Sequence, residues 1–472
     1  GANLGVTQAG RIEFALGGGR INADFIDNSA GVDCSDNEVN IKIALGAARR
    51  AGRLSEARRN ALLAEMTDSV SALVLEDNRL QALALSIAQT GGARAVLSQT
   101  RLIETLEATG ALDRKTEGLA ASDALARRAL EGRGLTRPEL AVLLSTTKLV
   151  LQDAMEASDL AHDHTVEPLL LGDFPQEMHG PFSSRILHHR LRNELVATVV
   201  ANKIVNRMGL VHPFELADEE SAGLDRICSA FLSASALLGL DEVWQALDSG
   251  KMPETARITL FEQAALALRS HMADLLRAGA GLISPSHAIA ELKSGVAELD
   301  THVEELLESE TRDHARRIAL ELAEMGAPER TARKVARLFE MDGAIGLAVL
   351  ARDSGIAPKL LARAFVDLGA RLGLDWAQST AAVMSPSDPW ERLLVAGLAR
   401  DFQQMRLDFL RVLARRKQAR HDLLGLIEAW AASHAAPIRQ FRAMVGRAQS
   451  AAPVAPAILA QIASQARSVL KR

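Results

Sequence analysis

Residues 27–38 combine side chains that could hold a flat polar ring and a small acidic molecule. The side chain of Asn28 carries an amide donor and an acceptor, which complement a carboxamide. Small residues at positions 29–31 allow a ring to approach the backbone closely. Ser35 followed by Glu38 has the spacing of a capping box, so we expect a helix to begin there. The unpaired N–H groups of such a helix start suit a carboxylate, and the segment therefore predicts one wall of a binding slot.

The same residues also have a purely structural interpretation. Ser35 as a helix N-cap needs no ligand, because a cap by itself stabilises a helix by about 1 kcal/mol. An asparagine such as Asn28 is typical of turns. Asp33 and Asp36 beside a helix start would interact favourably with the helix dipole. The spacing alone leaves the structural and the binding interpretation open.

Three other motifs do not predict a chemical site. The glycines at positions 17–19 lack the spacing of a phosphate-binding loop. His162 and His164 have no third ligand nearby in the sequence, and His188 and His189 would lie on divergent faces of a helix. The chain has only two cysteines, which give neither a disulfide framework nor zinc-ligand spacing. We therefore expect no metal.

The elements that would position residues 27–38 look like a slice of an α/β sheet. Residues 8–16 predict a short helix that ends at the following glycines, since glycine adopts the left-handed conformation easily. Residues 20–26 alternate apolar and polar side chains, which predicts a strand. Because so short a piece cannot form a sheet alone, the other strands would have to come from elsewhere.

Beyond this piece the pattern is helical almost without interruption. Thr136 and Glu139 form a second capping box, with Pro138 in the first turn. Residues 185–208 show an apolar stripe and predict one long helix ended by Gly209. Polar residues spaced four apart form a ladder along another side of this helix: Arg190, Glu194, Thr198, Asn202 and Asn206. We interpret this polar ladder either as structural or as a polar site between helices.

Composition restricts the class of protein. Hydrophobic residues make up 48% and charged residues 24% of the 472 residues, which is typical of a folded chain with two to four domains. Strong helix formers dominate, so the expected fold is mainly α. The formal net charge of −5 gives no basic excess for nucleic acid. The sequence contains no run of eighteen apolar residues, so it predicts no membrane span. The few cysteines fit a reduced, cytoplasmic compartment.

Residues 27–38 resemble the glutamate dehydrogenase turn Asn-Ala-Gly-Gly-Val-x-x-Ser-x-x-Glu. Ala30 departs from the first glycine of that motif, and five positions match: Asn28, Gly31, Val32, Ser35 and Glu38. Further stretches are similar to the large NAD-specific bacterial subclass of this family, in residues 1–8, 135–144, 158–160, 174–175, 189–194 and 205–209. The resemblance extends over nearly the whole chain and is loose beyond about residue 290.

The resemblance implies an oxidoreductase that deaminates L-glutamate to 2-oxoglutarate and ammonia with NAD as the cofactor. Asn3 and Asn28 would then bind the cofactor along its nicotinamide and ribose. Val32 and Ser35 would face the substrate, with Ser35 near its side-chain carboxylate. The lysine and the aspartate that such enzymes use for catalysis have no counterpart in this chain and would lie upstream, so the chain alone should be inactive.

We expect three regions and a homo-oligomer. Residues 1–45 would be the C-terminal piece of a Rossmann-like, NAD-binding catalytic domain, and residues 46–134 would be helices that pack on it. Residues 135–472 would form a helical C-terminal domain, with two possible subdomains divided near 280–300. The start at Gly1, without an initiator Met, suggests a fragment of a longer polypeptide. The alternative function is a non-catalytic helical module for scaffolding, regulation or oligomerisation.

Overall fold

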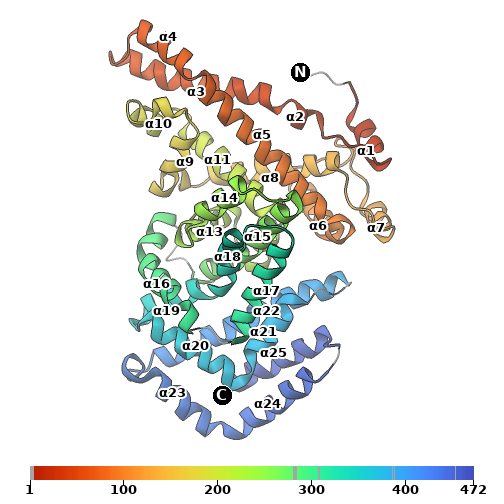
Figure 1. Ribbon diagram of the computed structural model, residues 1–472, viewed down its shortest axis with the longest axis vertical. Coiled ribbons are helices and arrows are strands. Elements are labelled where there is room, and N and C mark those ends of the chain that lie inside the picture. Colours follow the sequence, from red (N-terminus) through yellow and green to blue (C-terminus); the bar gives the residue numbers. More distant parts are fainter. Residues whose placement is uncertain are drawn as a thin grey trace. The chain divides into compact units, whose positions relative to one another are not determined.

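The computed structural model describes residues 5–279, 284–306, 309–384, 386, 388–451 and 453–471, and these residues are helical with no strand (Figure 1). They divide into two compact units, residues 1–232 with 283–286 and residues 233–282 with 287–472. The prediction of a mainly α fold is confirmed. The domain boundaries near residues 45 and 134 stay predictions.

The first unit contains twelve α-helices and three short 3-10 helices among its described residues. Their bounds are α1 (Gln8–Leu16), α2 (Asp24–Asp27), α3 (Ser29–Arg50), α4 (Glu56–Glu65), α5 (Thr67–Thr90), α6 (Gly92–Ala108), α7 (Ser122–Leu130), α8 (Arg137–Glu156), η1 (Leu160–His162), η2 (His164–Val166), α9 (Glu167–Gly172), η3 (Gln176–Met178), α10 (Ser183–Leu187), α11 (Arg192–Met208) and α12 (His212–Glu220). Helix α8 is the centre of this unit and contacts α1, α5 and α11.

The second unit is also built from helices. Their bounds are α14 (Leu240–Ser249), α15 (Glu254–Arg277), α17 (Ser309–Glu324), α18 (Glu329–Glu340), α19 (Ala344–Ser354), α20 (Pro358–Leu372), α21 (Leu374–Val383), α22 (Pro389–Ala414), α23 (Ala419–Ser433), α24 (Ala435–Gln449) and α25 (Pro456–Leu470). Helices α13 (Leu224–Leu237) and α16 (Pro285–Leu306) contain residues assigned to each unit. Helix α22 contacts α19, α20, α21, α23 and α25, so it is the core helix of the second unit.

Local capping explains the helix ends that the sequence predicts correctly. The Thr136 side chain and the Glu139 side chain cap each other's backbone at the start of α8, so the capping box is confirmed. Gly209 ends α11 with a φ of 82°, a conformation that glycine adopts without a steric penalty. Helix α1 covers the predicted residues 8–16, and Gly18 follows it with a φ of 91°.

Two predictions near the N-terminus are wrong. Residues 20–26 do not form a strand, because this segment turns into the single helical turn α2. The helix expected to begin at Ser35 begins six residues earlier, at Ser29. Ser35 therefore lies inside α3, where its hydroxyl donates to the Gly31 carbonyl oxygen at 3.2 Å, and Glu38 pairs with Lys42 instead of capping. The α/β piece is not present among the described residues.

The predicted helix 185–208 is interrupted at residues 188–191. His189 explains the break, because its imidazole anchors this segment to another part of the unit. Its Nε2 donates to the Asn40 carbonyl oxygen at 3.1 Å, and its Nδ1 accepts the Leu191 N–H at 3.1 Å. Arg190 thus lies outside α11 and is not part of the predicted ladder, whereas Asn206 within it is buried.

No single helix within the described ranges is long and apolar enough to cross a membrane; only α13 and α14, bent by 81°, would pass such a test as a pair.

Candidate functional site

The segment before Asn28 is held in place by one buried arginine. Arg11 on α1 is 7% exposed, and its guanidinium donates to Asp24 at 3.3 Å and to Asp27 at 3.0 Å. It also donates to the Asn22 carbonyl oxygen at 2.9 Å. The Asn22 amide in turn donates to Asp27 at 3.0 Å. Because two carboxylates and two carbonyl oxygens, those of Val6 and Asn22, converge on one planar cation, the backbone bends here instead of extending as a strand.

Helix α3 then presents the predicted residues on one face. Asn28, Val32, Ser35 and Val39 are separated by four, three and four positions, which places them along one side of a helix. Val32 and Val39 are 58% and 50% exposed, which is unusual for apolar side chains. The Asn28 side chain makes no hydrogen bond among the described residues and is half-buried. The structure therefore brings three of the four predicted site residues together, and Asn3 lies outside the described residues.

Contacts away from this face fix the helix in the unit. The Ser29 hydroxyl donates to the Ile26 carbonyl oxygen and to the side chain of Asn78 on α5. The His189 imidazole holds the Asn40 carbonyl oxygen in the middle of α3. Helix α3 is thus anchored by polar contacts on one side and leaves its other side available to a ligand or to another part of a protein.

A group of ionisable side chains close to α3 was not predicted from the sequence. It consists of Asp33 on α3, Asp77 on α5, Lys148 on α8 and Asp173 after α9. Asp77 is exposed and the other three are half-buried, and nearby protein atoms displace part of the water around all four. Desolvation, together with the neighbouring aspartates, raises the pKa of Asp173 to about 7 and that of Asp77 to about 6.

Desolvation acts in the opposite direction on the lysine of this group. It lowers the pKa of Lys148 to about 8, while the nearby Asp77 opposes the change. The Lys148 ammonium donates to the Gln81 side chain at 3.3 Å. Burial, together with Asp36, also raises the pKa of Asp33. The group can therefore exchange protons near neutral pH beside the helix that carries the predicted binding residues.

His164 and His188 make only local contacts in the described chain. His164 lies 3.0 Å from Glu167, and the His188 ring contacts the Ser184 carbonyl oxygen. Within the described ranges no three His, Cys, Asp or Glu side chains are placed to hold a metal ion.

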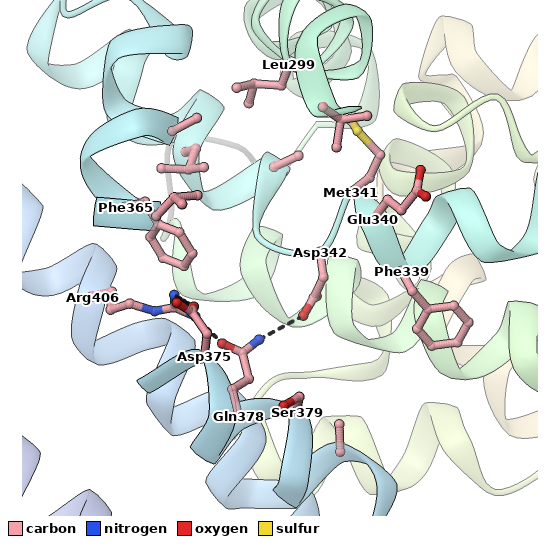
Figure 2. Close-up of a pocket in the computed structure, with 16 residues that line it drawn as sticks. Leu299, Phe339, Glu340, Met341, Asp342, Phe365, Asp375, Gln378, Ser379 and Arg406 are labelled. Carbon is pink, nitrogen blue, oxygen red and sulfur yellow. Dashed lines mark hydrogen bonds and ion pairs between the residues drawn. The ribbon is translucent and has the colours of Figure 1, made fainter. Parts of the chain in front are cut away.

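The second unit contains a cavity of about 150 Å³ lined by a chain of polar contacts (Figure 2). Arg406 is 2% exposed, pairs with Asp375 and Gln378, and lies 3.9 Å over the ring of Phe365. Gln378 donates to Asp342 at 3.3 Å. These contacts join α20, α21, α22 and the turn before α19, so their evident role is to hold the unit together.

A neighbouring cavity of about 600 Å³ shares Asp342 and Gln378 with the first. Asp274 lies behind the wall of this cavity and is 5% exposed. Its carboxylate accepts hydrogen bonds from the Gln403 amide at 3.0 Å and from the Gly346 N–H at 3.3 Å. Desolvation, with a smaller effect of Asp342, raises the pKa of Asp274 to about 7. None of the residues that the sequence predicts as binding residues lies in this unit.

Comparisons with known proteins agree on one family. Residues 132–467 match the family model "Glutamate dehydrogenase, C-terminal", and residues 1–88 match "Bacterial NAD-glutamate dehydrogenase, catalytic domain". The chain is 35% identical over 393 residues to an NAD-specific glutamate dehydrogenase of Halomonas elongata, covering 83% of this chain and 24% of that protein.

Two other relatives give the same result. An NAD-specific glutamate dehydrogenase of Pseudomonas aeruginosa is 31% identical over 447 residues, 94% of this chain and 28% of that protein. One of Mycobacterium tuberculosis is 32% identical over 400 residues, 83% of this chain and 24% of that protein. The chain spans about a quarter of the length of these relatives.

Proposed function

This chain belongs to the bacterial NAD-specific glutamate dehydrogenase family, and we propose that it forms part of an enzyme that deaminates L-glutamate oxidatively to 2-oxoglutarate and ammonia. NAD would be the cofactor and would accept the hydride from Cα of the substrate. The names of the matched relatives support both the reaction and the cofactor.

One observation carries the site assignment: the exposed face of α3 that includes Asn28, Val32 and Ser35. We propose that the Asn28 amide binds the nicotinamide portion of NAD, since its donor and acceptor have no partner within the described residues. Asn3 would contribute to the same cofactor. Val32 would contact the substrate carbon chain, and the Ser35 hydroxyl would donate to its side-chain carboxylate.

Large apolar side chains are exposed on each of the first three helices, and they support a missing neighbour in the complete enzyme. They are Phe14 on α1, Phe25 on α2, and Val32 and Val39 on α3. We propose that a Rossmann-like sheet from the rest of the catalytic domain covers this surface and supplies the catalytic lysine and aspartate. The chain alone would then have no turnover.

The remaining helices would not take part in the chemical step. Residues 132–467 match the C-terminal model of the family, and the polar contacts described in the second unit connect its own helices. We propose that this region serves in packing, regulation or homo-oligomer contacts. A wholly non-catalytic, scaffolding role for the chain is the second candidate, favoured by its mainly helical, internally paired structure.

Steady-state kinetics of the full-length enzyme that contains this chain would test the site. Ser35→Ala is expected to raise the KM for glutamate about 10- to 100-fold, the cost of one hydrogen bond to a charged group. Asn28→Ala is expected to raise the KM for NAD instead. Ser71→Ala is a matched control, because Ser71 is also an exposed helical serine whose hydroxyl donates to the carbonyl four residues earlier, at 2.9 Å.

Calorimetry separates the cofactor-binding role from the scaffolding role. A calorimetric titration of NAD into the 472-residue chain would show whether the α3 face binds the cofactor without the rest of the catalytic domain. If KM values in the Ser35 and Asn28 variants equal those of the Ser71 variant, the binding assignment of α3 is wrong and the scaffolding role is favoured.

A further inference from the structure

A hollow of about 410 Å³ in the second unit is lined by nine residues, five of which are basic. It lies where α19 and α22 end and α23 begins. Helix α22 contacts both α19 and α23 (Figure 1). Its cationic lining residues are Arg411, Arg415, Arg416, Lys417 and Arg420. A volume of this size is within the range of small-molecule sites.

Part of this charge is compensated inside the protein. Arg411 pairs with Asp408 at 2.6 Å, and the single acidic lining residue, Asp353, pairs with Arg352 at 2.7 Å. The other four cations have no ion-pair partner in the part of the chain that the structure describes. Asp422, which is close in sequence, accepts the Gly425 N–H and does not line the hollow.

Helix dipoles do not account for this excess. Basic residues are common near helix C-termini, and α19 and α22 both end at the hollow. Each terminus is equivalent to about half a negative charge. Against four uncompensated cations, two termini leave an excess of about three positive charges. Such an excess in a concave surface attracts a multiply charged anion.

The hollow is also shaped by the backbone. Arg420 donates to the Ser354 carbonyl oxygen at 3.1 Å, so its guanidinium is held at the end of α19. It lies over Gly355, where a Cβ would be only 3.2 Å from the guanidinium and where φ is +67°. Backbone hydrogen bonds from Arg416 to Leu413 and from Ala419 to Arg416, both 2.9 Å, fix the segment that carries the other cations.

The lining residues indicate the kind of anion. Guanidinium groups bind phosphate oxygens in pairs, and three of the uncompensated cations are arginines. No aromatic side chain lines the hollow, so a base of single-stranded nucleic acid has nothing on which to stack. We propose that this hollow binds a linear chain of phosphates, either free or carried by a nucleoside. This proposal is independent of the site on α3.

Calorimetric titration of the 472-residue chain with inorganic triphosphate tests the proposal, and saturable binding that weakens with salt is expected. Removing two guanidinium groups in Arg415→Gln/Arg416→Gln should weaken binding about 100-fold, at about tenfold for each group. The corresponding lysine pair, Arg415→Lys/Arg416→Lys, keeps the charge and should lose less affinity. Both altered positions are exposed, and circular dichroism checks that each variant is folded.

Arg50→Gln/Arg53→Gln is the matched control, because these exposed arginines, at and just after the end of α3, do not line the hollow. It should bind triphosphate like the wild-type chain. If ATP and triphosphate bind the chain with equal affinity, the site is specific for the phosphate chain alone. If ATP binds more tightly than triphosphate, the site is specific for a nucleotide. No saturable binding, an equal loss in the control, or tighter binding of single-stranded RNA than of triphosphate would overturn the proposal.

Discussion

Replacing Asp274 by asparagine tests the electrostatics of the second unit most directly. Asp274 is buried, and its carboxylate is surrounded by the Gln403 amide, the Gly346 N–H, Asp342 and Arg277. Desolvation and Asp342 raise its pKa, whereas Arg277 lowers it. Asparagine has nearly the same shape as the protonated acid and carries no charge, so Asp274→Asn mimics the protonated form at every pH.

The sign follows from the raised pKa. Between the ordinary value of 3.8 and about 7, the folded protein holds a proton on Asp274 that the unfolded chain has lost. The free energy of unfolding therefore falls as pH rises through this window and levels off above it. A shift of about three pH units corresponds to about 4 kcal/mol, an upper limit for the advantage of Asp274→Asn above pH 7. Near pH 4 the two proteins should be equally stable.

Differential scanning calorimetry across pH 4 to 8 measures this difference. For a unit of this size, the Asp274→Asn variant should melt on the order of 10 °C higher than the wild-type chain above neutral pH. Asp353→Asn is the control, because Asp353 forms an exposed ion pair with Arg352. It should change stability by less than about 0.5 kcal/mol. Parallel stability curves for the wild-type chain and Asp274→Asn would refute a raised pKa at this position.

Three further substitutions give sharp expectations. Glu139→Ala removes the buried partner of Arg128, 2.7 Å away, as well as the cap of α8, and should lower the free energy of unfolding by about 3 kcal/mol or more in urea titrations. Gly369→Ala places a Cβ 2.5 Å from Asp375 and should destabilise the chain by about 1–3 kcal/mol, whereas an unchanged melting temperature would contradict the described packing. Asp173→Asn removes a group with a pKa of about 7 and should flatten the pH dependence of stability between about 4 and 7, which thermal melts at several pH values would show.

Features fixed by neighbouring residues were predictable from the sequence. Thr136 and Glu139 are three positions apart and cap each other through local geometry alone. Gly209 ends α11 because only glycine adopts its backbone angles without strain. The spacing of Asn28, Val32 and Ser35 places them along one side of a helix, although that helix begins earlier than predicted.

Features fixed by distant residues were not predictable. The alternating pattern at residues 20–26 favours a strand, but Arg11 binds Asp24 and Asp27 and bends the backbone. His189 interrupts a helix because of its contact with a carbonyl 149 positions away. The ionisable group near α3 brings together side chains from four elements, and no pattern along the sequence connects them. The binding roles of Asn3, Asn28, Val32 and Ser35 stay predictions.

The contacts of Arg11 affect how a ligand would meet α3. The bend before Asn28 is fixed by an ion-paired, largely buried side chain of the chain itself. The backbone entropy of this bend is therefore lost when the chain folds and not when a ligand binds. Because association then requires little ordering of this segment, more of the contact energy remains as affinity. A rigid, pre-shaped wall of this kind also favours ligands that fit it without adjustment, so selectivity becomes a property of the folded chain itself.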